Sequence, residues 1–157
     1  MNIKLIAIGK TDNKALQTLI DDYQKRLSFY IKFDLEIIPD IKNVKNLSEA
    51  QQKEKEGELI LAKLSATDQL ILLDENGKNF SSKGFSEELQ KKMNSGIKTL
   101  VFVIGGPYGF SPEVYNKAQG KISLSAMTFS HQMVRLFFIE QVYRAFTILR
   151  NEPYHHQ

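Results

Sequence analysis

The residues Val101–Glu113, which read VFVIGGPYGFSPE, decide the fold of this chain. The first four are apolar, and such a run predicts a strand buried on both faces, as in a parallel sheet. Three glycines follow, and their backbone can approach a ligand closely because it carries no side chain. Ser111 then fits the N-cap of a helix, with Pro112 at the first helical position. Because ligands of open α/β sheets bind at the carboxyl ends of strands, we expect a cofactor at this turn.

Strands and helices alternate along the rest of the chain. Apolar spacing predicts strands at Asn2–Ile8, Lys32–Ile38, Gln69–Leu73, Thr99–Ile104 and Ile122–Leu124, and helices at Asn13–Phe29, Leu47–Leu64 (capped by Ser48), Ser82–Asn94, from Ser111, and Ser130–Leu149. Asn76-Gly77 predicts a turn. Alternation of this kind is typical of α/β proteins. We therefore predict one domain over residues 1–157, with a mainly parallel sheet and helices on both faces.

The predicted helix Ser130–Leu149 is apolar almost all round. Such a helix is buried on more than one side. In a chain of 157 residues a second protomer can supply that cover, so we expect a homodimer built on this helix. A central core helix of a monomer is the alternative. Glu140 and Arg144 are four residues apart, which predicts an ion pair on the helix.

The amino-acid composition excludes several classes of protein. The chain has no cysteine, which excludes disulfides, thiolate chemistry and cysteine-based zinc sites. No apolar run approaches the roughly 20 residues that cross a bilayer, so we expect a cytoplasmic protein without a membrane partner. Residues 114–157 hold five basic and two acidic side chains, while residues 1–113 are balanced. That excess would attract a polyanion, although small imbalances also arise without a partner.

The segment Leu124–Arg135 has no helical or strand period before Ser130, so we predict a loop between the last strand and the last helix. Its mixture of apolar and hydroxyl side chains suits a ligand with a flat apolar part and polar edges, such as adenine. A plain packed connection is the alternative.

The glycine turn matches neither the P-loop nor the dinucleotide-binding pattern. The last residue of the first predicted strand and the three residues after it read IGKT (residues 8–11). This sequence lacks the phosphate-binding glycines of a nucleotide-dependent oxidoreductase.

Several motifs in a fixed order give the chain a family resemblance. They are KEGE at residues 55–58, LD at 73–74 with GK at 77–78, FVIGGPYG at 102–109, LSAMTFSHQMVR at 124–135, EQVYRA at 140–145 and NEPYH at 151–155. Together they resemble the small SPOUT-class (α/β-knot) methyltransferases that methylate N3 of a pseudouridine in 23S ribosomal RNA. The resemblance spans the whole chain. It departs from the family at Ser130, where proline is usual, and at His156, where arginine or lysine is frequent.

The resemblance implies a deep trefoil knot in the carboxyl-terminal half, an obligate homodimer and S-adenosylmethionine as the methyl donor. It also implies action on the helix 69 region of 23S rRNA in the assembled ribosome, without a metal ion. The residues that it assigns to the cofactor are Leu73, Gly105, Leu124, Ser125, Ala126, Met127, Thr128 and Phe129.

Methyl transfer to N3 needs an aligned donor and acceptor, and help with the weakly acidic N3–H. The predicted catalytic residues are His155, Tyr154 and Arg144, and the predicted substrate-binding residues are His131 and Arg135. An imidazole can take up a proton, a phenol ring can stack on a base, and a guanidinium can stabilise an oxyanion or bind phosphate. Two alternatives stay open: His131 can be a packing residue, and Arg144 can serve only its ion pair.

The carboxyl-terminal tail is predicted to act across the dimer. Pro153 is expected to hold it extended and away from the preceding helix. A short tail in that position can reach the pocket of a partner protomer, so we predict a composite site that two chains share. The rival hypothesis is a non-catalytic RNA-binding module, for which the basic tail would suffice.

Overall fold

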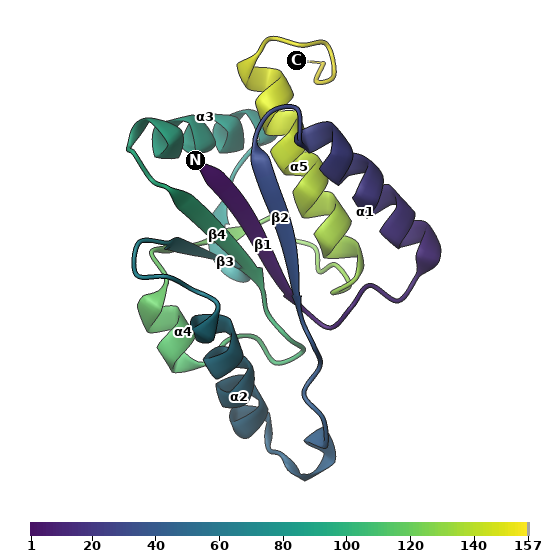
Figure 1. Ribbon diagram of the computed structural model, residues 1–157, viewed down its shortest axis with the longest axis vertical. Coiled ribbons are helices and arrows are strands. Elements are labelled where there is room, and N and C mark those ends of the chain that lie inside the picture. The colour runs from purple at the N-terminus through teal and green to yellow at the C-terminus, as the bar shows by residue number, and fades with distance from the viewer. Residues whose placement is uncertain (157) are drawn as a thin grey trace.

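The computed structural model describes residues 1–156 (Figure 1). Its strands are β1 (Asn2–Ile8), β2 (Lys32–Ile38), β3 (Gln69–Asn79), β4 (Thr99–Ile104) and β5 (Gly120–Ser123). Its helices are α1 (Lys14–Leu27), α2 (Glu49–Ala62), α3 (Ser82–Asn94), α4 (Pro112–Lys117), α5 (Met133–Leu149) and the short 3₁₀ helix η1 (Val44–Asn46). The predicted alternation of strands and helices is confirmed, although the last strand begins two residues earlier than predicted.

The strands form one sheet in the order β2-β1-β4-β3-β5, and all neighbouring pairs within residues 1–156 are parallel. Helices α1, α3 and α5 cover one face, and α2 and α4 cover the other (Figure 1). The connections β1–β2 and β3–β4 cross the sheet in one direction, and β2–β3 and β4–β5 cross in the opposite direction. Right-handed crossovers then place their helices on opposite faces. The predicted parallel α/β sheet with two helical layers is confirmed.

The central strand β4 is buried on both faces, as its apolar run predicted. Leu100, Phe102 and Ile104 belong to the core under α1, α3 and α5, whereas Val101 and Val103 belong to the core under α2 and α4. None of these side chains is more than 5 % exposed. Side chains alternate between the two faces of a strand, so one continuous apolar run supplies both cores.

Serine side chains begin two helices at the predicted positions. The Ser48 hydroxyl accepts a hydrogen bond from Gln51 N at 3.1 Å, and the Gln51 side chain accepts one from Ser48 N at 2.9 Å. This reciprocal pair is a capping box at the start of α2. Ser111 caps α4 through Val114 N, and Pro112 follows at the first helical position. The glycine turn after β4 therefore leads directly into a helix, as predicted.

The structure corrects the prediction of a turn at Asn76-Gly77. Strand β3 continues through both residues, and Lys78 pairs with Ile122 of β5 after a shift in register. A Cβ atom on Gly77 would lie 2.5 Å from the backbone carbonyl carbon of Ile122. The glycine is therefore required by the close approach of two strands. A contact between distant segments of this kind leaves no signal in local turn propensity.

Helix α5 begins three residues later than predicted, at Met133. Gln132, just before it, accepts a hydrogen bond from Asp12 N at 3.0 Å, which ties this turn to the segment after β1. The Ser130 hydroxyl accepts a hydrogen bond from Met133 N at 3.0 Å. Serine at the position where the resembling family has proline thus satisfies one of the free N–H groups at the helix start. No helix in the described part of the chain is long and apolar enough to cross a membrane.

Candidate active site

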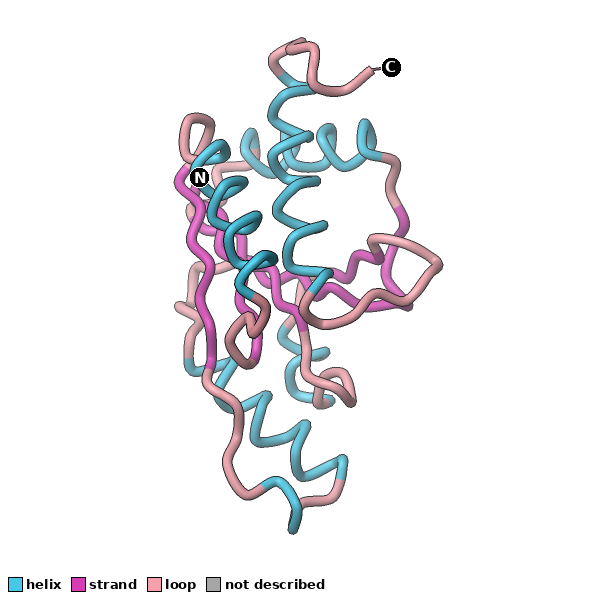
Figure 2. Tube along the Cα trace, turned by 90° about the vertical axis from the view of Figure 1, so that its right-hand side faces the viewer, coloured by secondary structure: helices cyan, strands magenta, loops and turns pink. Residues whose placement is uncertain are grey.

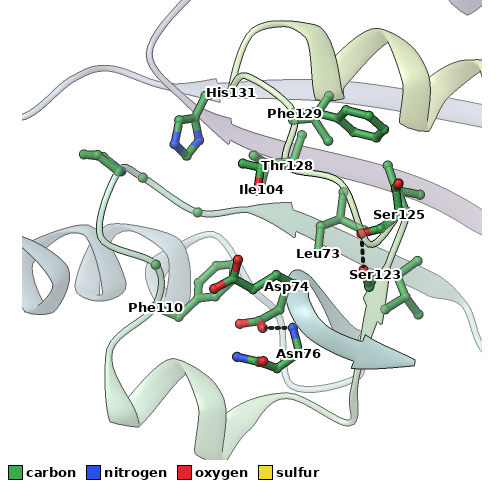
Figure 3. Close-up of a pocket in the computed structure, with 18 of the residues that line it drawn as sticks. Leu73, Asp74, Asn76, Ile104, Phe110, Ser123, Ser125, Thr128, Phe129 and His131 are labelled. Carbon is green, nitrogen blue, oxygen red and sulfur yellow. Dashed lines mark hydrogen bonds between the residues drawn. The ribbon is translucent and has the colours of Figure 1, made fainter. Parts of the chain in front are cut away.

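A cavity of about 460 Å³ opens at the carboxyl ends of β4 and β5 and beside residues 73–76 in the middle of β3 (Figure 3). This volume lies in the range of ~300–1,000 Å³ that is typical of small-molecule sites. His131 lines the cavity, and its ring points toward the turn after β4 (Figure 3). The lining also includes all the residues that the resemblance assigned to the cofactor, namely Leu73, Gly105, Leu124, Ser125, Ala126, Met127, Thr128 and Phe129.

The glycine turn after β4 (residues 105–109) forms one wall of the cavity. Gly106 and Gly109 form a backbone bridge, in which Gly109 N donates to Gly106 O at 3.2 Å. Gly109 has a φ of +84°, a conformation that favours glycine. A Cβ atom on Gly105 would lie 3.1 Å from the Phe110 ring. The turn is therefore tight, and its glycines keep backbone rather than side chains at the cavity.

A loop of residues 124–132 forms another wall. The Ser123 hydroxyl donates to Ser125 O at 2.9 Å (Figure 3), and the Ser125 hydroxyl accepts from Met127 N at 3.0 Å. These bonds hold the loop in a defined shape next to the end of β5. The predicted loop between the last strand and the last helix is confirmed.

Two acidic residues that sequence analysis did not assign to the site, Asp74 and Glu75, also line the cavity. Asp74 accepts hydrogen bonds from Asn76 N at 2.8 Å and from the Tyr115 hydroxyl. Burial, together with the bond to Asp74, raises the pKa of Tyr115 to about 12, so this hydroxyl stays a donor at neutral pH. A carboxylate directly after the predicted strand Gln69–Leu73 was the available signal in the sequence. Within residues 1–156 no group of three or more His, Cys, Asp or Glu side chains could hold a metal ion.

Arg135, predicted to bind substrate, lies outside the cavity. Its side chain is 1 % exposed. Its nitrogens donate to His131 O at 3.1 Å, to the Thr11 hydroxyl at 3.1 Å and to Ile8 O at 2.9 Å. These bonds hold the start of α5 to the end of β1. The placement argues against the predicted contact with substrate and indicates a structural role, because helical periodicity turns residue 135 toward the core.

Tyr154 and His155 of the tail lie against Arg144 in the distal half of α5. Arg144 Nη2 pairs with Glu140 Oε1 at 2.6 Å, which confirms the predicted ion pair. The Tyr154 hydroxyl donates to the same oxygen at 2.9 Å, and the Arg144 guanidinium lies 4.7 Å from the centroid of the Tyr154 ring. Arg144 Nη1 lies 3.1 Å from His155 Nδ1. Because a guanidinium can only donate, Nδ1 is the acceptor in this contact.

The tail turns back at the end of α5, which corrects the expectation that Pro153 holds it away from the helix. Asn151 has a φ of +55°, and its N–H donates to Ile148 O at 3.0 Å. Glu152 N donates to Thr147 O at 2.9 Å. These two bonds form a Schellman motif with Asn151 in the left-handed position. The signal that could have found it is an asparagine just past the C-cap residue Arg150, with a proline two residues later.

The tail and the cavity lie apart along α5. Val134 lines the cavity, whereas Glu140 and Arg144, which bind the tail, are six and ten residues further along the helix. At ~1.5 Å per residue these separations are about 9 and 15 Å. Neither Tyr154 nor His155 lines the cavity. Figures 1 and 2 show the end of the described chain beyond the far end of α5. The structure therefore does not bring the predicted catalytic residues to the predicted cofactor residues within one chain.

A family model described as "Predicted SPOUT methyltransferase" matches residues 1–155. The chain belongs to the SPOUT methyltransferase family. It is 90 % identical to the Ribosomal RNA large subunit methyltransferase H of Flavobacterium johnsoniae and 86 % identical to that of Flavobacterium psychrophilum. It is 66 % identical to the protein of the same name from Parabacteroides distasonis. Each comparison covers all 157 residues of this chain and the whole relative. The resemblance drawn from the ordered motifs is confirmed, and a SPOUT methyltransferase implies a methyl donor.

Proposed function

We propose that this protein is an S-adenosylmethionine-dependent methyltransferase that methylates N3 of a pseudouridine in 23S rRNA, in the helix 69 region of the assembled ribosome in the cytoplasm. The observation that carries the proposal is the single cavity lined by all the residues assigned to the cofactor, in a member of the SPOUT family. The name of the full-length relatives supports large-subunit rRNA as the substrate. The basic excess after residue 113 supports a polyanionic substrate.

The lining of the cavity fits this cofactor. Leu73 and Ile104 offer apolar surface to an adenine ring, and Ser125 offers a hydroxyl to its polar edges. Asp74 and Glu75 offer negative charge to the positively charged sulfur and amino group. When bound, S-adenosylmethionine supplies a methyl group that passes in line to N3, while its sulfur keeps the electron pair of the broken bond. The enzyme itself needs to align donor and acceptor and keep water out.

A homodimer on α5 is part of the proposal. Met133 and Phe137 of α5 are 41 and 38 % exposed in the single chain. Phe137 packs against Phe129 of the cavity loop, with ring centroids 4.9 Å apart, and Met127 of the same loop is 78 % exposed. Exposed apolar groups gathered beside a ligand cavity are typical of an interface. In a dimer with a two-fold axis next to this surface, the surface of one chain is buried against the same surface of the other chain.

The dimer gives the tail a role in the partner's site. Because the tail side chains are held away from their own cavity, a two-fold arrangement lets each tail serve the cavity of the other chain. The N3 proton passes to water before methyl transfer, which leaves negative charge on the uracil ring. The His155 imidazole and the Arg144 guanidinium stabilise this charge by hydrogen bonding, and the Tyr154 ring stacks on the base. His131, which lines the cavity, contacts the substrate there.

The trefoil knot is also part of the proposal. It is supported by membership of the SPOUT family and by the path of the chain after β4. The chain crosses from β4 past β3 to β5, and residues 124–132 then return to the cavity beside the glycine turn.

Mass spectrometry of 23S rRNA from a deletion strain tests the substrate. We expect the loss of one 3-methylpseudouridine, which the wild-type gene restores. An unchanged modification profile would refute the assignment.

Binding of labelled S-adenosylmethionine, measured with and without ribosomes, separates the enzyme from the non-catalytic RNA-binding module. We expect wild-type binding and its loss in Gly105→Trp, whose side chain fills the cavity. Phe29→Trp, at a residue that is 75 % exposed, is the matched control and should bind normally. Absence of binding to the wild type under both conditions would favour the module.

A further inference from the structure

Glu56 of α2 is a buried carboxyl group that the proposed reaction does not use. Its side chain belongs to the KEGE motif and is 4 % exposed. Within residues 1–156 its Oε1 atom is the one buried side-chain oxygen or nitrogen without a hydrogen-bond partner. None of the ion pairs among the described residues includes it. A buried polar atom without a partner is rare and is costly if it carries charge.

The carboxyl group lies directly against the glycine turn. A Cβ atom on Gly106 would lie 2.5 Å from each oxygen of Glu56. The next residue of α2, Gly57, is equally close to α4: its Cβ atom would lie 2.5 Å from the Ser111 hydroxyl. Helix α2 is thus pressed against both ends of the segment 105–111. Because Gly106 also lines the cavity, the turn lies between the Glu56 carboxyl group and the ligand space.

The surroundings of Glu56 favour its uncharged form. Burial raises its pKa and the nearby Asp40 carboxylate adds to the rise, while a hydrogen bond from Gln52 at 3.4 Å opposes it. Asp40 also interacts with the buried guanidinium of Arg135. Burial of a carboxyl group that has no ion-pair partner favours its neutral form.

We propose that Glu56 is a positioning residue of the methyl-donor cavity: its carboxyl group fills the space over Gly106 and holds the glycine turn in the shape that accepts the cofactor. The inference rests on the proposed function of the cavity. Loss of the proton places an unpaired charge between α2 and the turn, and the turn moves away so that water can reach the carboxylate. The contact between the Glu56 carboxyl group and the glycine turn is therefore complete below the pKa of Glu56 and is lost as the pH rises through that pKa.

Glu56→Gln tests this inference, because glutamine keeps the shape of the side chain and cannot ionise. Glu58→Gln is the matched control on the same helix, at an exposed carboxylate. We expect the wild type and Glu58→Gln to lose affinity for S-adenosylmethionine with rising pH, by up to about tenfold per pH unit above the pKa of Glu56. We expect Glu56→Gln to keep one affinity throughout. The same pH dependence in Glu56→Gln and in the wild type overturns the inference.

Hydrogen exchange provides a readout that does not need the cofactor. The amides of the turn 105–109 are expected to exchange faster in the wild type than in Glu56→Gln at alkaline pH, and equally at acidic pH. Glu56→Ala, which empties the space over Gly106, is expected to expose the same amides at every pH. Unchanged protection of these amides in a folded Glu56→Ala protein overturns the positioning role. If no variant binds S-adenosylmethionine while these exchange differences appear, the proposed function fails and the contact between Glu56 and the turn stands.

Discussion

A mixed dimer of two inactive variants is expected to regain methylation. One variant carries Gly105→Trp, which fills the cavity and leaves the tail intact. The other carries Tyr154→Ala and His155→Ala, which remove the tail side chains and leave the cavity intact. In the mixed dimer, the intact tail and the intact cavity belong to different chains. Only a tail that acts across the dimer can combine them.

The size of the recovery follows from two-fold symmetry. Each dimer has two sites, and a mixed dimer completes one of them. Random mixing in equal amounts makes about half of the dimers mixed, so the mixture is expected to show about one quarter of wild-type activity per dimer. A tail that serves its own cavity predicts no recovery. The structure argues against that case, because Arg144 binds His155 ten residues, or about 15 Å, along α5 from Val134 of the cavity.

Methyl incorporation into ribosomes from a deletion strain measures the recovery. Dimers purified through two different tags isolate the mixed species, which is expected to show about half of wild-type activity. Both variants need wild-type melting temperatures, so that unfolding does not explain their inactivity. Activity in verified mixed dimers no higher than in either variant alone would refute the composite site.

Three further predictions concern the fold. Gly77→Ala is expected to lower the free energy of unfolding by ~2 kcal/mol or more, because its Cβ would lie 2.5 Å from the Ile122 backbone; an unchanged urea midpoint would contradict this close approach. Phe102→Ala, at a side chain that is 2 % exposed, is expected to lower the free energy of unfolding by about 3–5 kcal/mol. Phe29→Ala, at a side chain that is 75 % exposed, is expected to lower it by less than about 0.5 kcal/mol, and similar losses in the two variants would contradict this prediction. The hydrogen bond to a tail carboxylate, with burial, raises the pKa of Tyr30 to about 12. The hydrogen bond therefore stabilises the fold fully below pH ~10, and this stabilisation is lost as the pH rises toward 12. The free energy of unfolding should fall less between these two pH values in Tyr30→Phe than in the wild type, and identical pH curves would count against this.

The alternation of elements could be predicted because each element carries its own local signal. The apolar run at 101–104 predicted a strand buried on both faces, and Ser48 and Ser111 are N-caps whose bonds reach only three residues along the chain. Residues 124–129 lacked any helical or strand period, and they lie in a loop. The order of the strands in the sheet was not predicted, because it depends on crossovers between distant segments.

The candidate site depended on contacts that no local pattern encodes. The lack of room at Gly77 and Gly106 depends on atoms of Ile122 and Glu56, which are distant along the chain. Arg135 was predicted at the substrate by the charge of its side chain, but its donors are used by backbone and hydroxyl groups near β1. Residue type gives the chemistry a side chain can perform, whereas its environment decides whether the side chain is available.

The sequence by itself determined the fold class and, through its ordered motifs, the family. Both depend on local spacing and residue type, which the chain carries without folding. The tertiary structure shows that Leu73, Gly105 and the loop after β5, which the resemblance assigned to the cofactor, line one cavity. It alone decided that the tail of the same chain binds α5 outside that cavity. The direction of the tail depends on a left-handed residue at Asn151 and on bonds to Glu140 and Arg144. These contacts exist only after the helix has formed, because they join groups that the folded backbone first brings together.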